Sequence, residues 1–332
     1  MRPEGDDSQA NTCTVRATPC GSLARALTVT PPTAGDPTAN RRFISLMTVG
    51  DYAWPAEVVV DARTVVVHGA PPSGLDRSTI ERSGAGDVLV ISSGANVRME
   101  HLVVTGATGG GSTGVTCLDD SALDLEDVQI DSNTGLGLLV GACMFVIRDS
   151  YIGGNGGGGL SLRRGRAVVV NDVIAGNGTS GPAGMDVGAM FVGSMIGTDS
   201  VIEPNTIIAN HAADSQADGL DCRVAGLTVR NTILTGDATK LRVSGTCTYD
   251  HVLYGPDDPM GRLGTADGNM LIPSTTDLQF VNAAGRDYHI KSNSFAKGKG
   301  TSTGLAQEAM TDVDGDVRPQ GAADVGIDEI PD

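Results

Sequence analysis

The chain is poor in aromatic residues, in positive charge and in long apolar segments. Phe, Trp and Tyr make up 3% of its 332 residues, and the formal net charge is −17. This charge disfavours binding to nucleic-acid phosphates or to an anionic membrane surface. The longest apolar run, residues 138–147, is interrupted by Gly141 and falls well short of the roughly 20 residues of a membrane-spanning helix. We therefore expect neither a nucleic-acid partner nor a transmembrane segment, and the composition leaves the oligomeric state open.

The chain also lacks the usual catalytic and metal-binding motifs. Its five histidines are scattered without ligand spacing, and neither an HExxH nor a Ser-His-Asp pattern occurs. The segment 154–159 matches the GxGxxG pattern of nucleotide sites, but a strand-like stretch follows it, so we interpret it as a flexible corner. The segment DVDGD brings Asp312, Asp314 and Asp316 together, but it lacks the Gly and Glu that complete an EF-hand. We expect no cofactor, and Ca²⁺ binding at these three carboxylates is the alternative to a structural turn.

What the chain does have is an internal repeat between residues 101 and 255. Seven blocks each begin with a polar residue, usually Asn or Asp, which is followed two and three positions later by a mostly apolar pair. The leading residues are His101, Asp127, Asp149, Asn171, Asn205, Asn231 and Asp250. They are 26, 22, 22, 34, 26 and 19 residues apart, and a unit near 22 residues with insertions is typical of a solenoid.

The repeat unit is a β-coil rather than a helical hairpin. Within each block the apolar residues alternate or form short β-branched runs, bounded by Gly, Asn and Asp. About 22 residues make one coil of a parallel β-helix, whose strands pair with the coils above and below at roughly 4.8 Å. Asn and Asp tolerate left-handed corners, and their side chains bond to nearby backbone groups. We therefore predict an all-β, single-stranded parallel β-helix in which the leading Asn and Asp residues form a ladder along one corner.

One elongated domain is expected, because each coil of a solenoid contacts only its neighbours. Residues 1–12 are polar and are predicted to be disordered, and the β-helix domain comprises residues 13–332. Within it, residues 13–41 are expected to form an N-terminal cap with a short helix. Residues 42–255 form the coils, and residues 256–332 form a loop, the last coils and a closing segment.

The six cysteines offer three candidate disulfides. The pairs are Cys13–Cys20, Cys117–Cys143 and Cys222–Cys247. The first pair closes a short loop in the cap, just before the helix that we expect Ser22 to begin, and its separation does not suit a metal or redox motif. The other pairs are 26 and 25 residues apart, which is close to one coil, so an inter-coil disulfide and two buried thiols are both open for each.

The end of the chain carries a more specific pattern. It reads FVN at 280–282, DYHI at 287–290 and DVDGDVRP at 312–319. This ending resembles that of bacterial exported right-handed parallel β-helix proteins of the pectate-lyase-like superfamily, and the chain departs from their pattern at 292–300 and 327–328. The resemblance implies a right-handed solenoid in a secreted or cell-surface protein. Because the first residues lack the apolar core of a signal peptide, it also implies a removed export signal or an N-terminus further upstream.

Enzymes of that superfamily place carboxylates or a basic residue on one strand face. In this chain a Gly-led strand recurs in successive coils, and alternation within it gives one outward column. Its members are Thr116, Leu139, Ser161, Asp186 and Asp221. Glycoside hydrolysis needs two carboxyl groups roughly 5–10 Å apart, which adjacent coils provide. Asp186 and Asp221 are therefore the candidate catalytic carboxylates. Arg163 and Arg223 flank them.

A basic cluster offers a second candidate site. Arg163, Arg164 and Arg166 lie close together in an otherwise acidic chain and suit an anionic polymer. Lyase chemistry would need a cation for a uronate carboxylate and a base, and Asp119, Asp120 and Arg163 are candidates for these roles. Aromatic residues that stack on sugars are scarce, with one Trp and five Tyr. We expect a structural or adhesive β-helix protein that contacts polysaccharide along one flank. The alternative is a polysaccharide lyase or a glycoside hydrolase.

Overall fold

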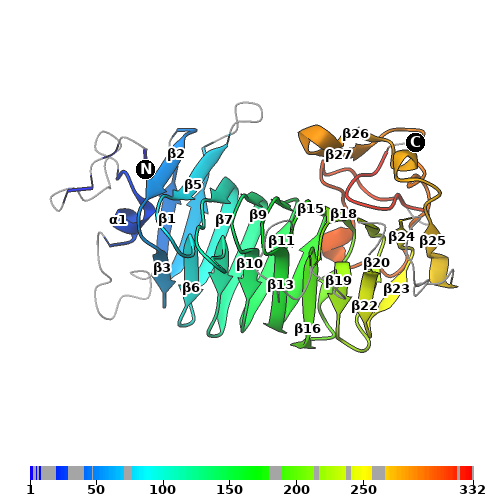
Figure 1. The fold of residues 1–332 in the computed structure, drawn as a ribbon, viewed down its shortest axis with the longest axis horizontal. Helices are drawn as coiled ribbons and strands as arrows, with labels where there is room; N and C mark the ends of the chain where they lie inside the picture. The colour runs from blue at the N-terminus through cyan, green and yellow to red at the C-terminus, as the bar shows by residue number, and fades with distance from the viewer. Residues whose placement is uncertain are drawn as a thin grey trace.

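Successive coils of the chain stack so that equivalent residues lie above one another (Figure 1). This computed structural model describes residues 1–2, 5, 7–8, 20–28, 41–46, 48–70, 77–178, 188–212, 217–236, 241–255, 266–319 and 322–330. Strands of neighbouring coils pair in parallel, as β10 (Leu136–Val140) does with β8 (Val115–Cys117) and β13 (Gly158–Gly165). The prediction of an all-β parallel β-solenoid is therefore confirmed.

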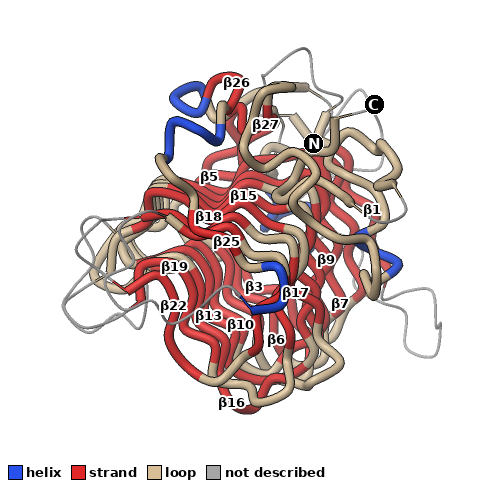
Figure 2. The backbone as a smooth tube through the Cα atoms, turned by 90° about the vertical axis from the view of Figure 1, so that its right-hand side faces the viewer, coloured by secondary structure: helices blue, strands red, loops and turns tan. Residues whose placement is uncertain are grey.

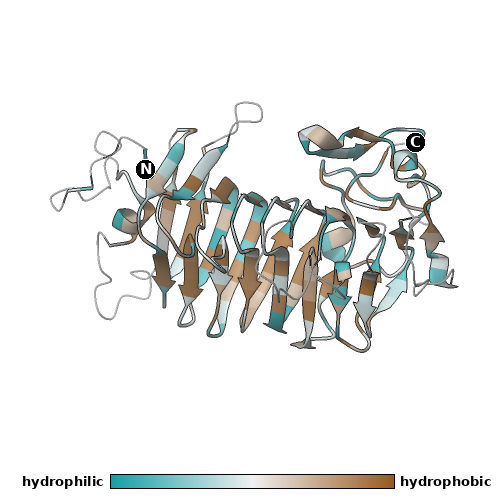
Figure 3. Ribbon diagram, in the orientation of Figure 1, coloured by the Kyte–Doolittle hydropathy of each residue, from teal (hydrophilic) through white to brown (hydrophobic). Residues whose placement is uncertain are grey.

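The solenoid has three walls, which are visible when it is viewed toward its end (Figure 2). The first wall is an eight-stranded sheet. Beside the three strands above, it contains β3 (Val58–Asp61), β6 (Leu89–Ser92), β16 (Met190–Ile196), β19 (Ala217–Cys222) and β22 (Leu241–Gly245). Alternate residues are the more buried ones in β3 and β6. The brown strands of Figure 3 show how apolar the walls are.

The second and third walls belong to one 17-stranded sheet. The second wall consists of β1 (Arg41–Ser45), β4 (Thr64–His68), β11 (Cys143–Arg148), β14 (Ala167–Val170), β17 (Val201–Ile202), β20 (Thr228–Arg230) and β23 (Thr248–Asp250). The third wall consists of β2 (Asp51–Trp54), β5 (Ser78–Arg82), β12 (Tyr151–Gly153), β15 (Asp172–Ala175), β18 (Asn205–Asn210), β21 (Ile233–Gly236), β24 (Leu253–Tyr254) and β25 (Met270–Leu271). Two long strands, β7 (Asn96–Thr105) and β9 (Ser121–Asp131), bend through the corner and join both walls.

The corner between these walls is built by residues in the left-handed conformation. His101, Asp127, Asp149, Asn171 and Asn231 all have positive φ there, between 45° and 56°. The prediction is off by one residue at two other coils. Asn205 pairs with Asp172 and is buried, and Asp250 pairs with Arg230, so that His251 takes the corner position.

A different and more regular ladder lies inside the solenoid, at the end of the third wall. Its members are Asn133, Asn155, Asn177 and Asn210, one from each of four successive coils, and all are at most 1% exposed. Each side chain donates to the amide oxygen of the next, at 2.8–3.0 Å. The sequence contains a signal for this ladder, since each Asn ends its repeat block. The prediction instead assigned the ladder to the residues that begin each block.

The N-terminal end is covered by α1 (Leu23–Thr28), which buries Leu23, Ala26 and Leu27 as predicted. Ser22 Oγ accepts a hydrogen bond from Arg25 N at 3.1 Å and so caps the helix. Within the segment expected to be disordered, Met1 has defined contacts: it is buried, and its carbonyl accepts a bond from the Tyr52 hydroxyl. In the part of the chain that the structure describes, no helix combines the length and the apolar character needed to cross a membrane.

Two disulfides join neighbouring coils. Cys117–Cys143 and Cys222–Cys247 have Cα–Cα distances of 6.0 and 5.6 Å, so for these pairs the disulfide alternative is confirmed. Cys20 is also disulfide-bonded, and its predicted partner Cys13 lies outside the described residues.

The C-terminal region folds back over the third wall. It contains the antiparallel hairpin β26 (Phe280–Asn282) and β27 (Asp287–Ile290), drawn above the solenoid in Figure 1. Four 3₁₀ turns accompany it, η1 (Ala266–Gly268), η2 (Thr275–Leu278), η3 (Ala283–Gly285) and η4 (Gln307–Ala309). Tyr288 and Ile327 pack on Val173 and Ala175 of β15. The hairpin and the closing segment after it therefore cover part of the corner.

Candidate functional site

The predicted catalytic column has a different composition in the structure. Phe191 pairs with Ser161 on one side and with Asp221 on the other. The position expected for Asp186 thus belongs to Phe191, and Asp186 itself lies outside the described residues. The reason is the long insertion before β16, which moves the strand about five residues further along the chain than the repeat spacing predicts.

Asp221 does not lie in an open groove. It is 2% exposed, and its Oδ2 accepts hydrogen bonds from Arg223 at 3.0 and 2.6 Å. The Arg223 guanidinium also stacks over the Phe191 ring, 4.9 Å from its centroid. A carboxylate held this way stabilises the wall, and in the described part of this column no second carboxylate lies next to it.

The basic cluster is dispersed over the surface. Arg163 donates to Ser161 at 3.2 Å, while Arg166 lies near Asp199 and Glu308. Arg164 and Asp120 both line an open pocket of about 240 Å³ beside Cys143. Asp119 and Asp120 form an exposed turn with positive φ. The three arginines therefore do not converge on one ligand position.

The segment from Asp312 to Asp316, for which Ca²⁺ binding was the alternative to a structural turn, forms a hydrogen-bonded turn. Asp312 is 3% exposed, and its Oδ1 accepts hydrogen bonds from the backbone N–H groups of Asp314 and Asp316. Its Oδ2 accepts a third bond, from Glu329 N. In the described part of the chain two other groups bring metal-ligand atoms within 4.8 Å of one another. They are His68, Glu100 and His101, and His289, Asp314 and Asp328.

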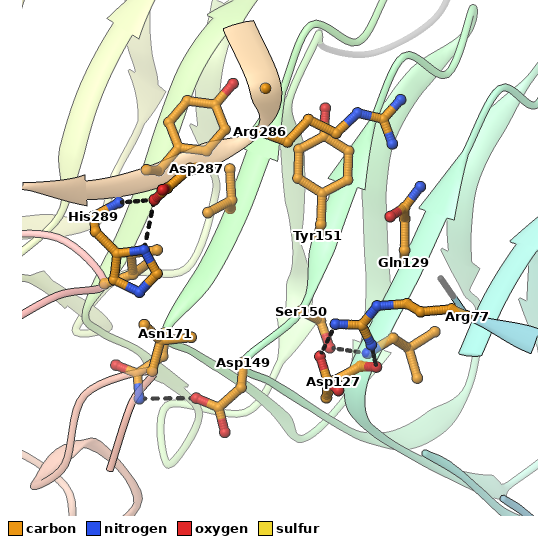
Figure 4. Close-up of a pocket in the computed structure, with 16 residues that line it drawn as sticks. Arg77, Asp127, Gln129, Asp149, Ser150, Tyr151, Asn171, Arg286, Asp287 and His289 are labelled. Atoms are coloured by element: carbon orange, nitrogen blue, oxygen red, sulfur yellow. Dashed lines mark hydrogen bonds and ion pairs between the residues drawn. The ribbon is translucent and has the colours of Figure 1, made fainter. Parts of the chain in front are cut away.

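A cavity lies between the third wall and the C-terminal region. Its volume is about 350 Å³, within the range of small-ligand sites. We call it the corner pocket. It is lined on one side by Arg77, Asp127, Val128, Gln129, Asp149, Ser150, Tyr151, Asn171 and Val173, and on the other by Gly285, Arg286, Asp287, Tyr288, His289, Val313 and Ile327. Figure 4 shows the two sets facing each other.

Successive coils supply the solenoid side of the corner pocket. Gln129 pairs with Tyr151, and Tyr151 with Val173, so these residues form one outward column on the third wall. Asp127, Asp149 and Asn171 form the neighbouring corner column. This geometry follows from the repeat, because residues 22 positions apart stack directly.

The C-terminal side is fixed by ionic and aromatic contacts. Arg286 donates to Asp131 at 2.6 Å and lies over the Tyr151 ring, 4.8 Å from its centroid. His289 Nδ1 lies 2.6 Å from Asp287 Oδ1. Burial opposes charge on His289, but the Asp287 hydrogen bond and the nearby carboxylates raise its pKa. Burial also raises the pKa of Tyr288 to about 12, so its hydroxyl stays protonated.

Two carboxyl groups on adjacent coils of the corner pocket have different surroundings. Asp127 Oδ1 accepts a hydrogen bond from Arg77 Nη2 at 2.5 Å, and Asp127 Oδ2 lies 2.8 Å from His101 Nδ1. Asp149 instead accepts one bond from the Asn171 amide at 3.1 Å. Burial raises the pKa of Asp149 to about 6, although the Asn171 hydrogen bond acts in the opposite direction. One carboxyl is thus paired with the Arg77 guanidinium, and the other favours its proton.

Asn171 connects the corner pocket to the closing segment. Its Nδ2 donates to Asp149 and to the Thr311 carbonyl, and its Oδ1 accepts a bond from Arg318. The Arg318 side chain is fully buried, and it also donates to Asp324 O, Gly326 O and the Glu329 carboxylate. Arg318 of the terminal motif therefore positions the segment that closes the pocket.

Comparison with known proteins adds little to this geometry. No family model matches the sequence, and no curated protein matches it. One solved structure that is similar in fold is the pectate lyase Pel9A. It is 12% identical, the match covers 100% of this chain and 96% of that chain, and the TM-score is 0.47.

Proposed function

We propose that this chain is a carbohydrate-binding β-solenoid with a structural or adhesive role outside the reducing cytoplasm, and that the corner pocket binds a saccharide. The observation that carries the proposal is the mixed lining of the pocket. Tyr151, Tyr288 and Val173 offer apolar surface for the C–H faces of a sugar, and carboxyl, amide and hydroxyl groups offer partners for its hydroxyls. The inter-coil disulfides support an oxidising compartment.

The charges in the corner pocket favour a neutral saccharide over a uronate. Its two arginines are already paired, Arg77 with Asp127 and Arg286 with Asp131. Asp149 has the Asn171 amide rather than a guanidinium as its hydrogen-bond partner. A ligand carboxylate next to Asp149 would gain no new ion pair. A neutral sugar hydroxyl, in contrast, can donate a hydrogen bond to the Asp149 carboxyl group.

The test is a glycan array followed by calorimetry with the saccharides that bind. We expect Tyr151→Ala to weaken binding at least tenfold, because it removes the apolar floor of the pocket. Phe43→Ala is the matched control, since Phe43 is an exposed aromatic residue outside the pocket. Equal binding by both variants and the wild type would place the site elsewhere, and an array without any bound glycan would refute the proposal.

A second candidate function, glycoside hydrolysis, is favoured by the pair Asp127 and Asp149. Hydrolases need one carboxylic acid that donates a proton and one carboxylate that acts as base or nucleophile, and unequal surroundings provide such a pair. Asp149 would be the acid and Asp127 the carboxylate. Asp149→Asn keeps the shape of the pocket, so under this function it abolishes release of reducing sugar while binding is retained. A wild-type protein that binds but never cleaves the saccharide leaves the binding function alone.

A further inference from the structure

Two imidazoles and a carboxylate converge on the outer face of the second wall, next to the corner. His68 of β4 pairs in register with Glu100 of β7, and His101 follows Glu100 at the corner. Their ligand-type atoms lie within 4.8 Å of one another, and the two ring centroids are 5.1 Å apart. All three side chains are partly exposed, between 16% and 35%. Sequence spacing could not reveal this group, because His68 and Glu100 come together only through the stacking of coils.

The hydrogen bonds of both rings leave the same nitrogen free for a ligand. His68 Nδ1 lies 2.6 Å from the Gly69 carbonyl oxygen, which can only accept, so this nitrogen carries the proton. His101 Nδ1 lies 2.8 Å from Asp127 Oδ2, a carboxylate oxygen, and is held in the same way. In the neutral form of each ring the lone pair is therefore on Nε2. Ligand histidines in metal sites commonly have this arrangement, with a carboxylate or carbonyl on the other nitrogen.

Glu100 is oriented by its own partner. Arg98 Nε contacts Oε1 of Glu100, while Oε2 lies 3.7 Å from His68 Nε2. Arg98 also forms ion pairs with Asp124 and Glu126. One carboxylate oxygen thus faces the imidazoles, and the other is fixed by a guanidinium.

We propose that His68 Nε2, His101 Nε2 and Glu100 Oε2 bind a divalent transition metal ion such as Zn²⁺. Two nitrogens and one oxygen suit Zn²⁺, Co²⁺ or Ni²⁺, whereas Ca²⁺ and Mg²⁺ prefer oxygen alone. Metal–nitrogen distances of about 2.0–2.1 Å require ligand atoms roughly 3.4 Å apart, so small side-chain rotations close the site. The site is separate from the saccharide proposal, although Asp127 belongs to both surroundings.

The other group is a weaker candidate and serves as an internal control. His289 Nε2 lies 3.3 Å from Asp314 Oδ2, and Asp328 Oδ2 already accepts a bond from Ile290 N. It offers one nitrogen instead of two. His251 is a further control, since its Nδ1 pairs with Asp250 Oδ1 at 2.6 Å but it belongs to neither group.

The experiment is titration of the chelator-treated full chain with Co²⁺, followed by visible absorption, and with Zn²⁺, followed by calorimetry. We expect one equivalent to bind with ligand-field bands, and His68→Ala and His101→Ala each to weaken binding at least tenfold. Asp127→Asn should weaken it about tenfold, because it removes the carboxylate behind His101. His251→Ala and His289→Ala should bind as the wild type does. Thermal unfolding without metal checks that each variant is folded.

A measurement on the unmutated protein keeps the test independent of folding defects. Zn²⁺ should shift the imidazole ¹⁵N resonances of His68 and His101 and leave those of His251 unchanged. The proposal is overturned if His68→Ala and His101→Ala bind Co²⁺ like the wild type, if His289→Ala abolishes binding, or if the two resonances do not move.

Discussion

The side-chain amide of Asn155 donates to the amide oxygen of Asn177, one coil away, across 3.0 Å inside the solenoid. The same oxygen accepts the backbone N–H of Asn155 at 3.1 Å. Asn177 in turn donates to Asn210 and to the Ile152 carbonyl. A shift of one coil by a single residue would leave these buried amides unpaired, so the ladder fixes the register of the coils.

Asn177→Ala should therefore be costly. It removes four hydrogen bonds and leaves buried donors of Asn155 without a partner, which should lower the free energy of unfolding by about 3 kcal/mol. Urea unfolding measures the change. Asn96→Ala is the matched control, because Asn96 is exposed and its loss should cost no more than about 0.5 kcal/mol. Similar values for the two variants would show that the ladder does not stabilise the fold.

The repeat revealed the fold because stacking makes equivalent residues periodic. Apolar residues and corner residues recur near every 22 positions, and both patterns are visible without coordinates. The same periodicity did not predict which residue faces outward after an insertion, as at Phe191. The length of an insertion does not show where the next strand begins, so the alternation of buried and exposed residues cannot be continued across it. At Asn205 and Asp250 a slip of one residue was enough to move the predicted ladder off the corner.

The corner pocket was harder to foresee than the walls. Its solenoid side follows from the repeat, as the stacking of Gln129, Tyr151 and Val173 shows. Its other side comes from Arg286 and the residues after it, which lie more than 100 positions away in sequence and carry no repeat. Their placement depends on tertiary contacts such as the Arg286–Asp131 ion pair, which local patterns do not encode.

The inter-coil disulfides should contribute measurably to stability. Cys222–Cys247 closes a loop of 25 residues, so replacing both cysteines by Ala should lower the free energy of unfolding by about 3 kcal/mol. Cys117–Cys143, with a separation of 26, should behave alike. Unfolding of the two double variants under oxidising conditions tests this. Reductant breaks both of these disulfides in the wild type, so its stability should fall below that of either oxidised double variant. A wild type that is insensitive to reductant would contradict the prediction.

Arg318→Lys should loosen the closing segment. A lysine cannot reproduce the guanidinium fork that reaches Asp324 O and Gly326 O, and it leaves the buried Glu329 carboxylate poorly paired. We expect a loss of about 3 kcal/mol and faster proteolysis after residue 290, before the coils unfold. Arg164→Lys, on the exposed first wall, is the control and should be near neutral. Proteolysis that begins in the coils would contradict this order of events.

The last prediction concerns the pH dependence of Asp149. Burial raises the pKa of its carboxyl group from 3.8 to about 6 in the folded chain. The folded state therefore holds this proton more tightly than the unfolded chain does. Its contribution favours folding at low pH and is lost as the pH rises from about 4 to about 6. Asp149→Asn cannot ionise and should not show this loss.

The difference in unfolding free energy between Asp149→Asn and the wild type should therefore depend on pH. Between pH 4 and pH 7 it should change by about 1–2 kcal/mol in favour of the variant, after allowance for the partial exposure of the group. Taking the difference between variant and wild type cancels the contributions of other titrating groups. One such group is Glu329, whose pKa burial raises to about 7. Asp119→Asn, an exposed turn residue, should show a flat difference. A flat difference for Asp149→Asn as well would mean that Asp149 ionises as readily in the corner pocket as in water, and would remove the proton donor that the hydrolase function requires.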